Sequence, residues 1–140
     1  MSVVMGVDVG GSKVAAAPVD GSGRMLADPI YEPSVSTDTG AFVAGLTGTL
    51  KRALVQAAPL GPKAVGLACA GTVDKNREMV VVSPNLPLDR VPLAVLLEDA
   101  LGLPVVLEND VNAALLAEVS RGVAKGLEHV VMLALGTGVG

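Results

Sequence analysis

Apolar and polar positions follow two different spacings along this chain, and each spacing predicts one kind of secondary structure. Runs rich in Val, Ala, Leu and Ile are of strand length and cover residues 3–9, 12–19, 24–30, 64–70, 79–82, 105–107 and 130–135. Elsewhere apolar residues recur every three or four positions, which predicts amphipathic helices over residues 39–57, 92–101 and 111–123. The order β-β-β-α-β-β-α-β-α-β is typical of an α/β fold, in which a mixed sheet carries helices on both faces.

Polar residues and glycines mark where these helices should begin and end. Residues 37–39, Thr-Asp-Thr, offer N-caps for the first helix, and Asp89 offers one for the second. Gly102, followed by Pro104, should stop the second helix. No long linker or internal repeat divides the chain, so we expect one domain over residues 1–140.

A glycine pair separates the first two predicted strands, in the sequence Asp8-Val-Gly10-Gly11-Ser12-Lys13. Two glycines let backbone amides approach a phosphate closely, while Ser12 adds a hydroxyl donor and Lys13 a positive charge. Asp8 is suited to hold Mg²⁺ through water, because that ion dehydrates reluctantly. An ordinary hairpin turn explains the same residues, since they match neither a Walker A loop nor a GxGxxG fingerprint.

The most informative stretch joins the strand that ends near residue 107 to the helix that follows. It reads Glu108-Asn109-Asp110-Val-Asn112, and burial alone does not select two carboxylates and two amides in five positions. Open α/β sheets bind ligands where their strands end. There Asp110 can accept the proton of a sugar hydroxyl, while Asn109 donates and accepts hydrogen bonds. The alternative is that Asn109 or Asp110 only caps the helix.

A second glycine loop, Gly136-Thr137-Gly138-Val-Gly140, follows the last predicted strand. One such loop is weak support for a phosphate site, but two of them flank the Asn-Asp pair in the sequence. Together they predict that a nucleotide's phosphates are held from two sides, with a carboxylate facing the acceptor hydroxyl. A glycine loop normally leads into a further element, so we expect the chain to be part of a longer protein.

Composition narrows the expected partners. The 140 residues are 51% hydrophobic but only 1% aromatic, and the net charge is −4. Base stacking and phosphate tracking need aromatic and basic residues that are scarce here, so nucleic acid is not an expected partner. No run reaches the roughly 18 apolar residues that span a bilayer, and the N-terminus does not read as a signal peptide, so no membrane partner and a cytoplasmic location are expected. The single cysteine, Cys69, cannot form an internal disulfide.

Five segments occur in the order seen in one family of proteins. They are Asp8–Lys13, Gly71–Asp74, Pro84–Pro87, Glu108–Ala114 and Leu135–Gly140. Over residues 3–140 the sequence resembles the ROK family (repressor, open reading frame, kinase), and within it the glucokinase-like sugar kinases. The resemblance implies an actin-like (ribonuclease-H-like) ATPase fold, of which this chain is the N-terminal of two lobes.

The resemblance also implies roles for individual residues. Asp110 matches the catalytic base of such kinases. The substrate-binding positions are Asn109, Asn85, Gly71 and Glu108, the phosphate- or ATP-binding positions are Gly10, Gly11, Ser12, Lys13, Gly136, Thr137 and Gly138, and the Mg²⁺ position is Asp8. The implied cofactors are ATP and Mg²⁺.

The sequence departs from the family pattern at two positions. Cys69-Ala-Gly71-Thr stands where a Pro-Gly-Pro turn or a similar one is common, which bears on sugar specificity, and Ser12 replaces the commoner Thr. His129 does not match the family's zinc cluster and is expected to be structural. Any structural zinc belongs to the second half of the family's proteins.

The implied function is ATP-dependent phosphorylation of a hexose, with glucose the first candidate, by a longer protein that is expected to be a homodimer. The 140-residue chain alone is expected to be nearly inactive, because half of the cleft is missing. Three alternatives stay open: a sugar-responsive transcriptional regulator of the same family, a non-catalytic sugar-binding module, and a kinase that uses polyphosphate as its donor.

Overall fold

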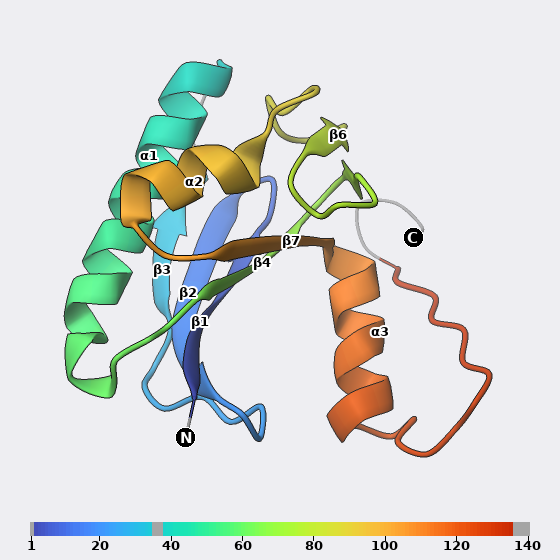
Figure 1. Ribbon diagram of the computed structural model, residues 1–140. Coiled ribbons are helices and arrows are strands. Elements are labelled where there is room, and N and C mark those ends of the chain that lie inside the picture. Colours follow the sequence, from blue (N-terminus) through green and yellow to red (C-terminus); the bar gives the residue numbers. More distant parts are fainter. Residues whose placement is uncertain (1, 35–37, 136–140) are drawn as a thin grey trace.

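The computed structural model describes residues 2–34 and 38–135 and is built around a mixed five-stranded β-sheet (Figure 1). The strands lie in the order β3-β2-β1-β4-β7. Their bounds are Val3–Val9 for β1, Lys13–Asp20 for β2, Ile30–Pro33 for β3, Val65–Cys69 for β4 and Val105–Asn109 for β7. β2 pairs antiparallel with β1 and β3, whereas β4 runs parallel to β1 and β7. The predicted mixed sheet is therefore confirmed.

The three parallel strands end side by side. Val9 of β1 lies opposite Cys69 of β4, and Cys69 lies opposite Asn109 of β7. The carboxyl ends of parallel strands form the edge at which open α/β sheets bind ligands. The register thus brings the residues that follow these strands to one edge of the sheet.

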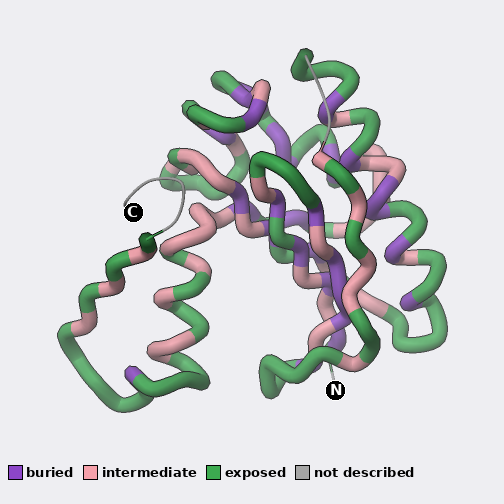
Figure 2. Tube along the Cα trace, turned by 180° about the vertical axis from the view of Figure 1, so that it is seen from behind, coloured by how far each residue is buried: buried purple, intermediate pink, exposed green. Residues whose placement is uncertain are grey.

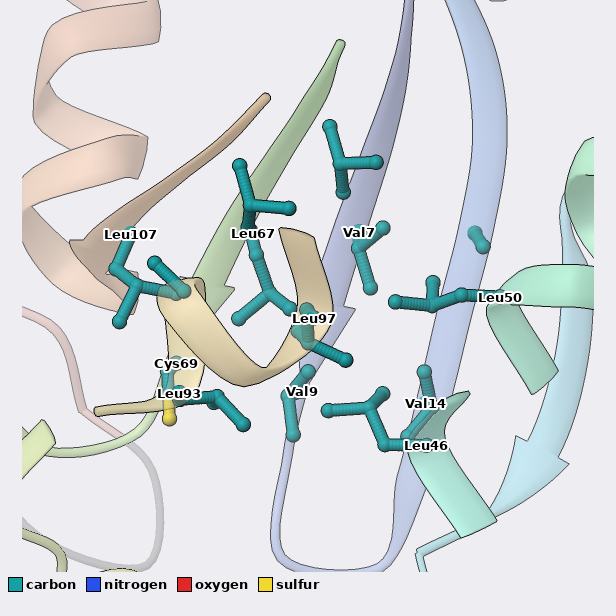
Figure 3. Close-up of a cluster of buried hydrophobic side chains, with 14 of the residues drawn as sticks. Val7, Val9, Val14, Leu46, Leu50, Leu67, Cys69, Leu93, Leu97 and Leu107 are labelled. Carbon is teal, nitrogen blue, oxygen red and sulfur yellow. The ribbon is translucent and has the colours of Figure 1, made fainter. Parts of the chain in front are cut away.

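Two helices cover one face of the sheet (Figure 1). Alternate strand residues point toward them, so that Leu67 and Leu107 meet Leu97 in one apolar cluster (Figure 3). None of the helices among the described residues is both long and apolar enough to cross a membrane. The bounds on this face are Thr39–Gln56 for α1, Ala58–Leu60 for the short 3-10 turn η1, and Leu93–Leu101 for α2.

The caps of α1 and α2 follow the sequence in two places. Asp38 caps α1, since its Oδ1 accepts a hydrogen bond of 2.9 Å from the amide of Ala41. The other candidate at the start of this helix, Thr37, lies outside the described residues. α2 ends at Gly102, whose φ of +67° is the left-handed conformation that favours glycine.

The predicted cap of α2 is wrong. This helix begins after Pro92, with no side-chain hydrogen bond at its N-terminus. Val91 pairs with Val80 in an antiparallel bridge, which keeps the backbone extended up to the helix. Asp89 therefore lies too far ahead of the first turn to accept hydrogen bonds from its amides.

The third helix, α3 (Asp110–Arg121), leaves the end of β7 on the side away from α1 and α2 (Figure 1). Its last residue reaches the turn after β2, where Arg121 Nη2 donates a hydrogen bond of 2.6 Å to the carbonyl oxygen of Gly21. Although α3 is described over its whole length, none of its 12 residues is buried (Figure 2). This face of the sheet is therefore covered only in part.

The predicted strand over residues 24–30 is wrong. Within this described stretch Met25 makes a single bridge to β2, and the third strand forms later, as β3. Asp20 Oδ1 accepts a hydrogen bond of 3.1 Å from the amide of Arg24 and so holds a turn here. Pro29 has no amide hydrogen to give to a ladder, which also opposes a strand.

A second, two-stranded sheet forms from β5 (Thr72–Val73) and β6 (Val80–Val82). The strand expected over residues 79–82 is thus confirmed as β6, whereas its partner β5 was not predicted. Two residues are too short a run to show alternation, so β5 carries no sequence pattern of its own.

The last predicted strand, over residues 130–135, is also wrong. Residues 130–134 lie within the described part of the chain and form no helix or strand. The side chains of Val131 and Leu133 are 89% and 75% exposed. A strand needs a neighbour that takes up its backbone hydrogen bonds, and no described strand lies against this segment.

Candidate active site

The carboxyl edge of the sheet brings together two of the predicted acidic residues. Asp8 stands one residue before the end of β1, and Asp110 follows β7 directly. Burial raises the pKa of Asp8, and the negative charge of Asp110 raises it further, against the opposing charge of Lys13. Burial also raises the pKa of the Cys69 thiol to about 12, with added contributions from Asp110 and Asp8. The negative charges of Asp8 and Asp110 are therefore both felt at Cys69, the last residue of β4.

Asn109 connects the ends of two strands and starts a helix. Its Nδ2 donates hydrogen bonds of 2.9 Å to the carbonyl oxygen of Gly71 and of 3.1 Å to Asp110 Oδ1. Its Oδ1 accepts hydrogen bonds of 3.0 Å from the amides of Val111 and Asn112. A side-chain amide has two donors and two acceptor positions, so all four are used within the chain. The cap hypothesis is therefore correct for Asn109, and a ligand can gain this amide only by replacing one of the four bonds.

Asp110 is held by one oxygen only. Its Oδ1 accepts the bond from Asn109 and another of 2.9 Å from the amide of Val111. Among the described residues, no hydrogen bond to its Oδ2 is formed. One carboxylate oxygen is thus fixed by the helix N-terminus, and the other faces no donor of the described chain. Such a carboxylate is positioned to accept a hydrogen bond from a hydroxyl group.

Gly71 occupies a place that only glycine fits. Its φ is +157°, and a Cβ atom there would lie 2.7 Å from the carbonyl oxygen of Val82. The Ser83 hydroxyl donates a hydrogen bond to the carbonyl oxygen of Ala70, the residue before it. The two successive carbonyl groups after β4 are therefore held by different residues, Ala70 by Ser83 and Gly71 by Asn109.

The glycine turn between β1 and β2 lies against another predicted sugar-contacting residue. A Cβ atom added to Gly11 would lie 3.4 Å from the Asn85 Cβ atom. The turn is closed by a 3.0 Å hydrogen bond from the Gly10 amide to the Lys13 carbonyl oxygen, and the Ser34 amide donates to Ser12. Ser12 and Gly11 are exposed, so this hairpin turn also presents accessible backbone to solvent. The structure brings residues 10–12 and Asn85 together, although 73 positions separate Ser12 from Asn85.

Lys13 points toward an aromatic ring. Its Nζ lies 4.9 Å from the centre of the Tyr31 ring, in a cation–π contact across β2 and β3. The Lys13 ammonium group, which was expected to contact phosphate, therefore lies over Tyr31 of β3. A phosphate on the glycine turn has to draw this flexible side chain away from Tyr31 to contact it.

The Glu108 carboxylate is bound by neighbouring residues of the chain. Its Oε1 accepts hydrogen bonds of 3.0 Å from the Asn109 amide and 3.3 Å from Asn112 Nδ2, while its Oε2 pairs with Arg77 Nη2 at 3.1 Å. Arg77 was not singled out from the sequence. Its only signal there is its place in the turn-forming run Asp74-Lys-Asn-Arg77, which does not indicate where the side chain points.

The remaining predicted site residues divide into two groups. Gly136, Thr137 and Gly138 lie outside the described residues. His129 is exposed, and the described part of the chain contains no cluster of three or more metal-binding side chains. Asp8 and Asp110 supply carboxylate oxygens, the donor type that Mg²⁺ prefers, and burial together with the charge of Asp110 raises the pKa of Asp8.

Comparison with known proteins assigns this arrangement to a family. The ROK family model matches residues 4–140. The chain belongs to the ROK family. The resemblance read from the five sequence segments is thereby confirmed.

Glucokinases are among the relatives of this ROK chain. The glucokinase of Streptomyces coelicolor is 37% identical over 142 residues, which cover 100% of this chain and 43% of that protein. The crystal structure of a ROK family glucokinase from Streptomyces griseus in complex with glucose and AMPPNP has a TM-score of 0.87 and 35% identity, over 99% of this chain and 43% of the other. The actin-like fold expected from the resemblance is confirmed by this similarity.

Repressors are related as well. The xylose repressor of Caldicellulosiruptor bescii is 24% identical over 140 residues, which cover 98% of this chain and 35% of that protein. This ROK chain thus spans less than half the length of these relatives.

Proposed function

We propose that the protein containing this ROK chain is an ATP-dependent hexose kinase with glucose as its first candidate substrate, and that residues 1–140 form its N-terminal lobe. The observation that carries the proposal is the pairing of Asn109 and Asp110 beside Gly71, at the edge where three parallel strands end. The glucokinase relatives support the same activity.

Asp110 is the general base of the proposed reaction. The sugar hydroxyl oxygen forms a bond to the terminal phosphorus of ATP while the bond from that phosphorus to the bridging oxygen breaks, and ADP leaves. The hydroxyl proton passes to Asp110 Oδ2, the oxygen that no described donor holds. Phosphoryl transfer has a loose transition state, so the proton moves late and an ordinary carboxylate is basic enough to take it.

Asn109 and Gly71 line the sugar site in this mechanism, and Asn109 exchanges one of its four hydrogen bonds for a bond to the sugar. Their hydrogen bond fixes the distance between the ends of β4 and β7, so a hexose meets a preformed pair of polar groups. Asn85 lies beside Gly11 and is the third sugar-contacting residue of this proposal.

The amides of Gly11 and Ser12 and the Ser12 hydroxyl receive phosphate in the proposed complex, whereas the Gly10 amide already donates to the Lys13 carbonyl oxygen. Backbone amides in a tight turn form a concave site for anions, and the exposure of Gly11 leaves that site accessible. Mg²⁺, when bound, neutralises charge on the phosphates. Asp8 would hold it, through water, beside Asp110.

The test is ADP release by the complete protein with a panel of hexoses, comparing Asp110→Asn with Asp99→Asn. Asp99 is exposed on α2 and serves as the matched control. We expect glucose-dependent ADP release, unchanged in Asp99→Asn and lowered about 10²- to 10⁴-fold in Asp110→Asn, the usual worth of a general base. Absence of hexose-dependent turnover with ATP contradicts the proposal, and turnover with polyphosphate alone assigns a different donor.

A sugar-responsive regulator is the second candidate, because a xylose repressor is among the relatives. It predicts sugar binding without turnover, together with sugar-dependent binding of the complete protein to operator DNA. The net charge of −4 on this chain argues against DNA contact through these residues. A gel-shift assay with the complete protein, with and without sugar, separates the two functions.

A further inference from the structure

The turn between β5 and β6 docks onto the outer edge of the main sheet. Asp74 builds this turn, because its Oδ1 accepts hydrogen bonds of 2.9 Å from the amides of Glu78 and Met79. Arg77, at the tip, has a φ of +61°, which few residues other than glycine adopt. Its carbonyl oxygen accepts a 3.1 Å hydrogen bond from the Leu107 amide in β7. The main chain of Arg77 thus accepts a hydrogen bond from the outer edge of β7, the strand that ends in the candidate site.

The side chain of the same residue reaches one position further along β7. Arg77 Nη2 lies 3.1 Å from Glu108 Oε2, and the two side chains are 52% and 19% exposed. The other oxygen, Glu108 Oε1, accepts from the amide of Asn109 and from the side chain of Asn112. One oxygen of Glu108 is therefore held by Arg77. The other oxygen holds Asn109 and Asn112, which lie on either side of Asp110 in the sequence.

We propose that Arg77 and Glu108 form a positioning pair for the hexose site. Arg77 fixes the Glu108 carboxylate, and that carboxylate fixes the turn from β7 into α3 in which Asn109 and Asp110 lie. Both Glu108 oxygens already have partners within the chain, so in this proposal Glu108 serves the site by orienting its neighbours. The kinetic part of this inference rests on the proposed function, whereas its structural part does not.

A surface ion pair ordinarily contributes little to folding, and the position of this one gives it a further role. An isolated pair would change stability slightly and leave the site alone. Here the pair joins the Asp74 turn to the end of β7, next to Asp110. A displacement of about 1 Å beside reacting groups can lower activity far more than it lowers stability.

The structural test is amide hydrogen exchange in the complete protein, comparing Arg77→Met with Arg90→Met. Arg90 is the matched control: its φ is also left-handed, at +52°, and it makes no ion pair among the described residues. Both variants keep a long side chain and the same backbone demand. We expect the amides of residues 109–112 to exchange about three- to tenfold faster in Arg77→Met and to be unchanged in Arg90→Met. Unchanged exchange in Arg77→Met overturns the proposal.

The kinetic test separates positioning from general stability. In an active protein, Arg77→Met should raise the KM for hexose about three- to tenfold at a temperature well below unfolding, leave the KM for ATP unchanged, and be partly rescued by Arg77→Lys. Glu108→Gln should have a similar effect, and the double variant should be no worse than either single one, because both changes break the same pair. Additive effects, or hexose kinetics unchanged in Arg77→Met, overturn the proposal. Inactivity of the unaltered protein contradicts only the proposed function, since hydrogen exchange still decides the positioning role.

Discussion

Asn109 donates a hydrogen bond of 2.9 Å from its side-chain amide to the carbonyl oxygen of Gly71, 38 residues earlier in the chain. This bond joins the segment after β4 to the segment after β7. Because the same side chain also caps α3, one residue sets the spacing of two strands and the start of a helix. Folding and, in the proposed function, sugar binding therefore depend on the same amide.

Replacing Asn109 with Ala should lower the free energy of unfolding of this chain by about 2 kcal/mol, the sum of a lost N-cap and a lost, partly buried hydrogen bond. Urea unfolding followed by circular dichroism measures the change. The control is Asn112→Ala, which removes an exposed amide with one long hydrogen bond of 3.3 Å and should cost less than about 0.5 kcal/mol. Equal losses for the two variants would show that neither the cap nor the Gly71 bond contributes to stability.

Replacing Gly71 with Ala should be more costly than replacing Gly61 with Ala. Both glycines have a positive φ, +157° and +62°, but a Cβ atom at position 61 meets no other atom within 4 Å. At position 71 it would lie 2.7 Å from a carbonyl oxygen. We expect a loss of about 1 kcal/mol for Gly61→Ala and about 3 kcal/mol for Gly71→Ala, measured by thermal or urea unfolding. Similar values for both variants would mean that the loop after β4 yields easily.

Asp8 and Asp74 should affect stability with opposite dependence on pH. The pKa of Asp8 is raised in the folded chain by burial and by Asp110, so its contribution is fully present below the unfolded value of 3.8 and is lost as pH rises through the folded value. The pKa of Asp74 is lowered by hydrogen bonds from the Met79 and Glu78 amides, so its contribution is present above 3.8 and is lost as pH falls through the folded value.

The corresponding variants make this contrast measurable. At pH 7, Asp8→Asn should raise the free energy of unfolding and Asp74→Asn should lower it, and both differences should shrink toward pH 3. Urea unfolding of the three proteins across this range provides the comparison. A gain in stability for Asp8→Asn combined with a loss of kinase activity in the complete protein is the pattern expected of a site residue. A pH-independent effect of Asp8→Asn would contradict a raised pKa of Asp8 in the folded chain.

Cys69 should resist alkylation while the chain is folded. The side chain is fully buried, and burial raises its pKa to about 12. At pH 8 only about one thiol in ten thousand would be ionised, and the thiolate is the reactive form. Iodoacetamide followed by intact mass measurement should show labelling only after urea is added. Rapid labelling of the folded chain would place the end of β4 in contact with solvent.

The sequence by itself determined those features that depend on neighbouring residues. The strand runs of β1, β2, β4 and β7 and the helix α1 follow from the spacing of apolar side chains, which a segment carries wherever it lies. The stop at Gly102 and the cap at Asp38 follow from backbone and hydrogen-bond preferences of single residues. The position of Asn109 and Asp110 at a strand-to-helix junction was also readable, because a local change in periodicity marks it.

Only the tertiary structure decided which segments meet. Residues 130–134 have the apolar pattern of a strand and form none, since no described strand lies against them. Asp89 has the chemistry of a cap, but a bridge between Val91 and Val80 delays the helix. The contacts of Asn85 with Gly11 and of Arg77 with Glu108 join residues far apart in the chain. Such contacts depend on how strands align and turns dock, and the free energy that selects them is shared among many residues, so no short stretch of sequence displays it.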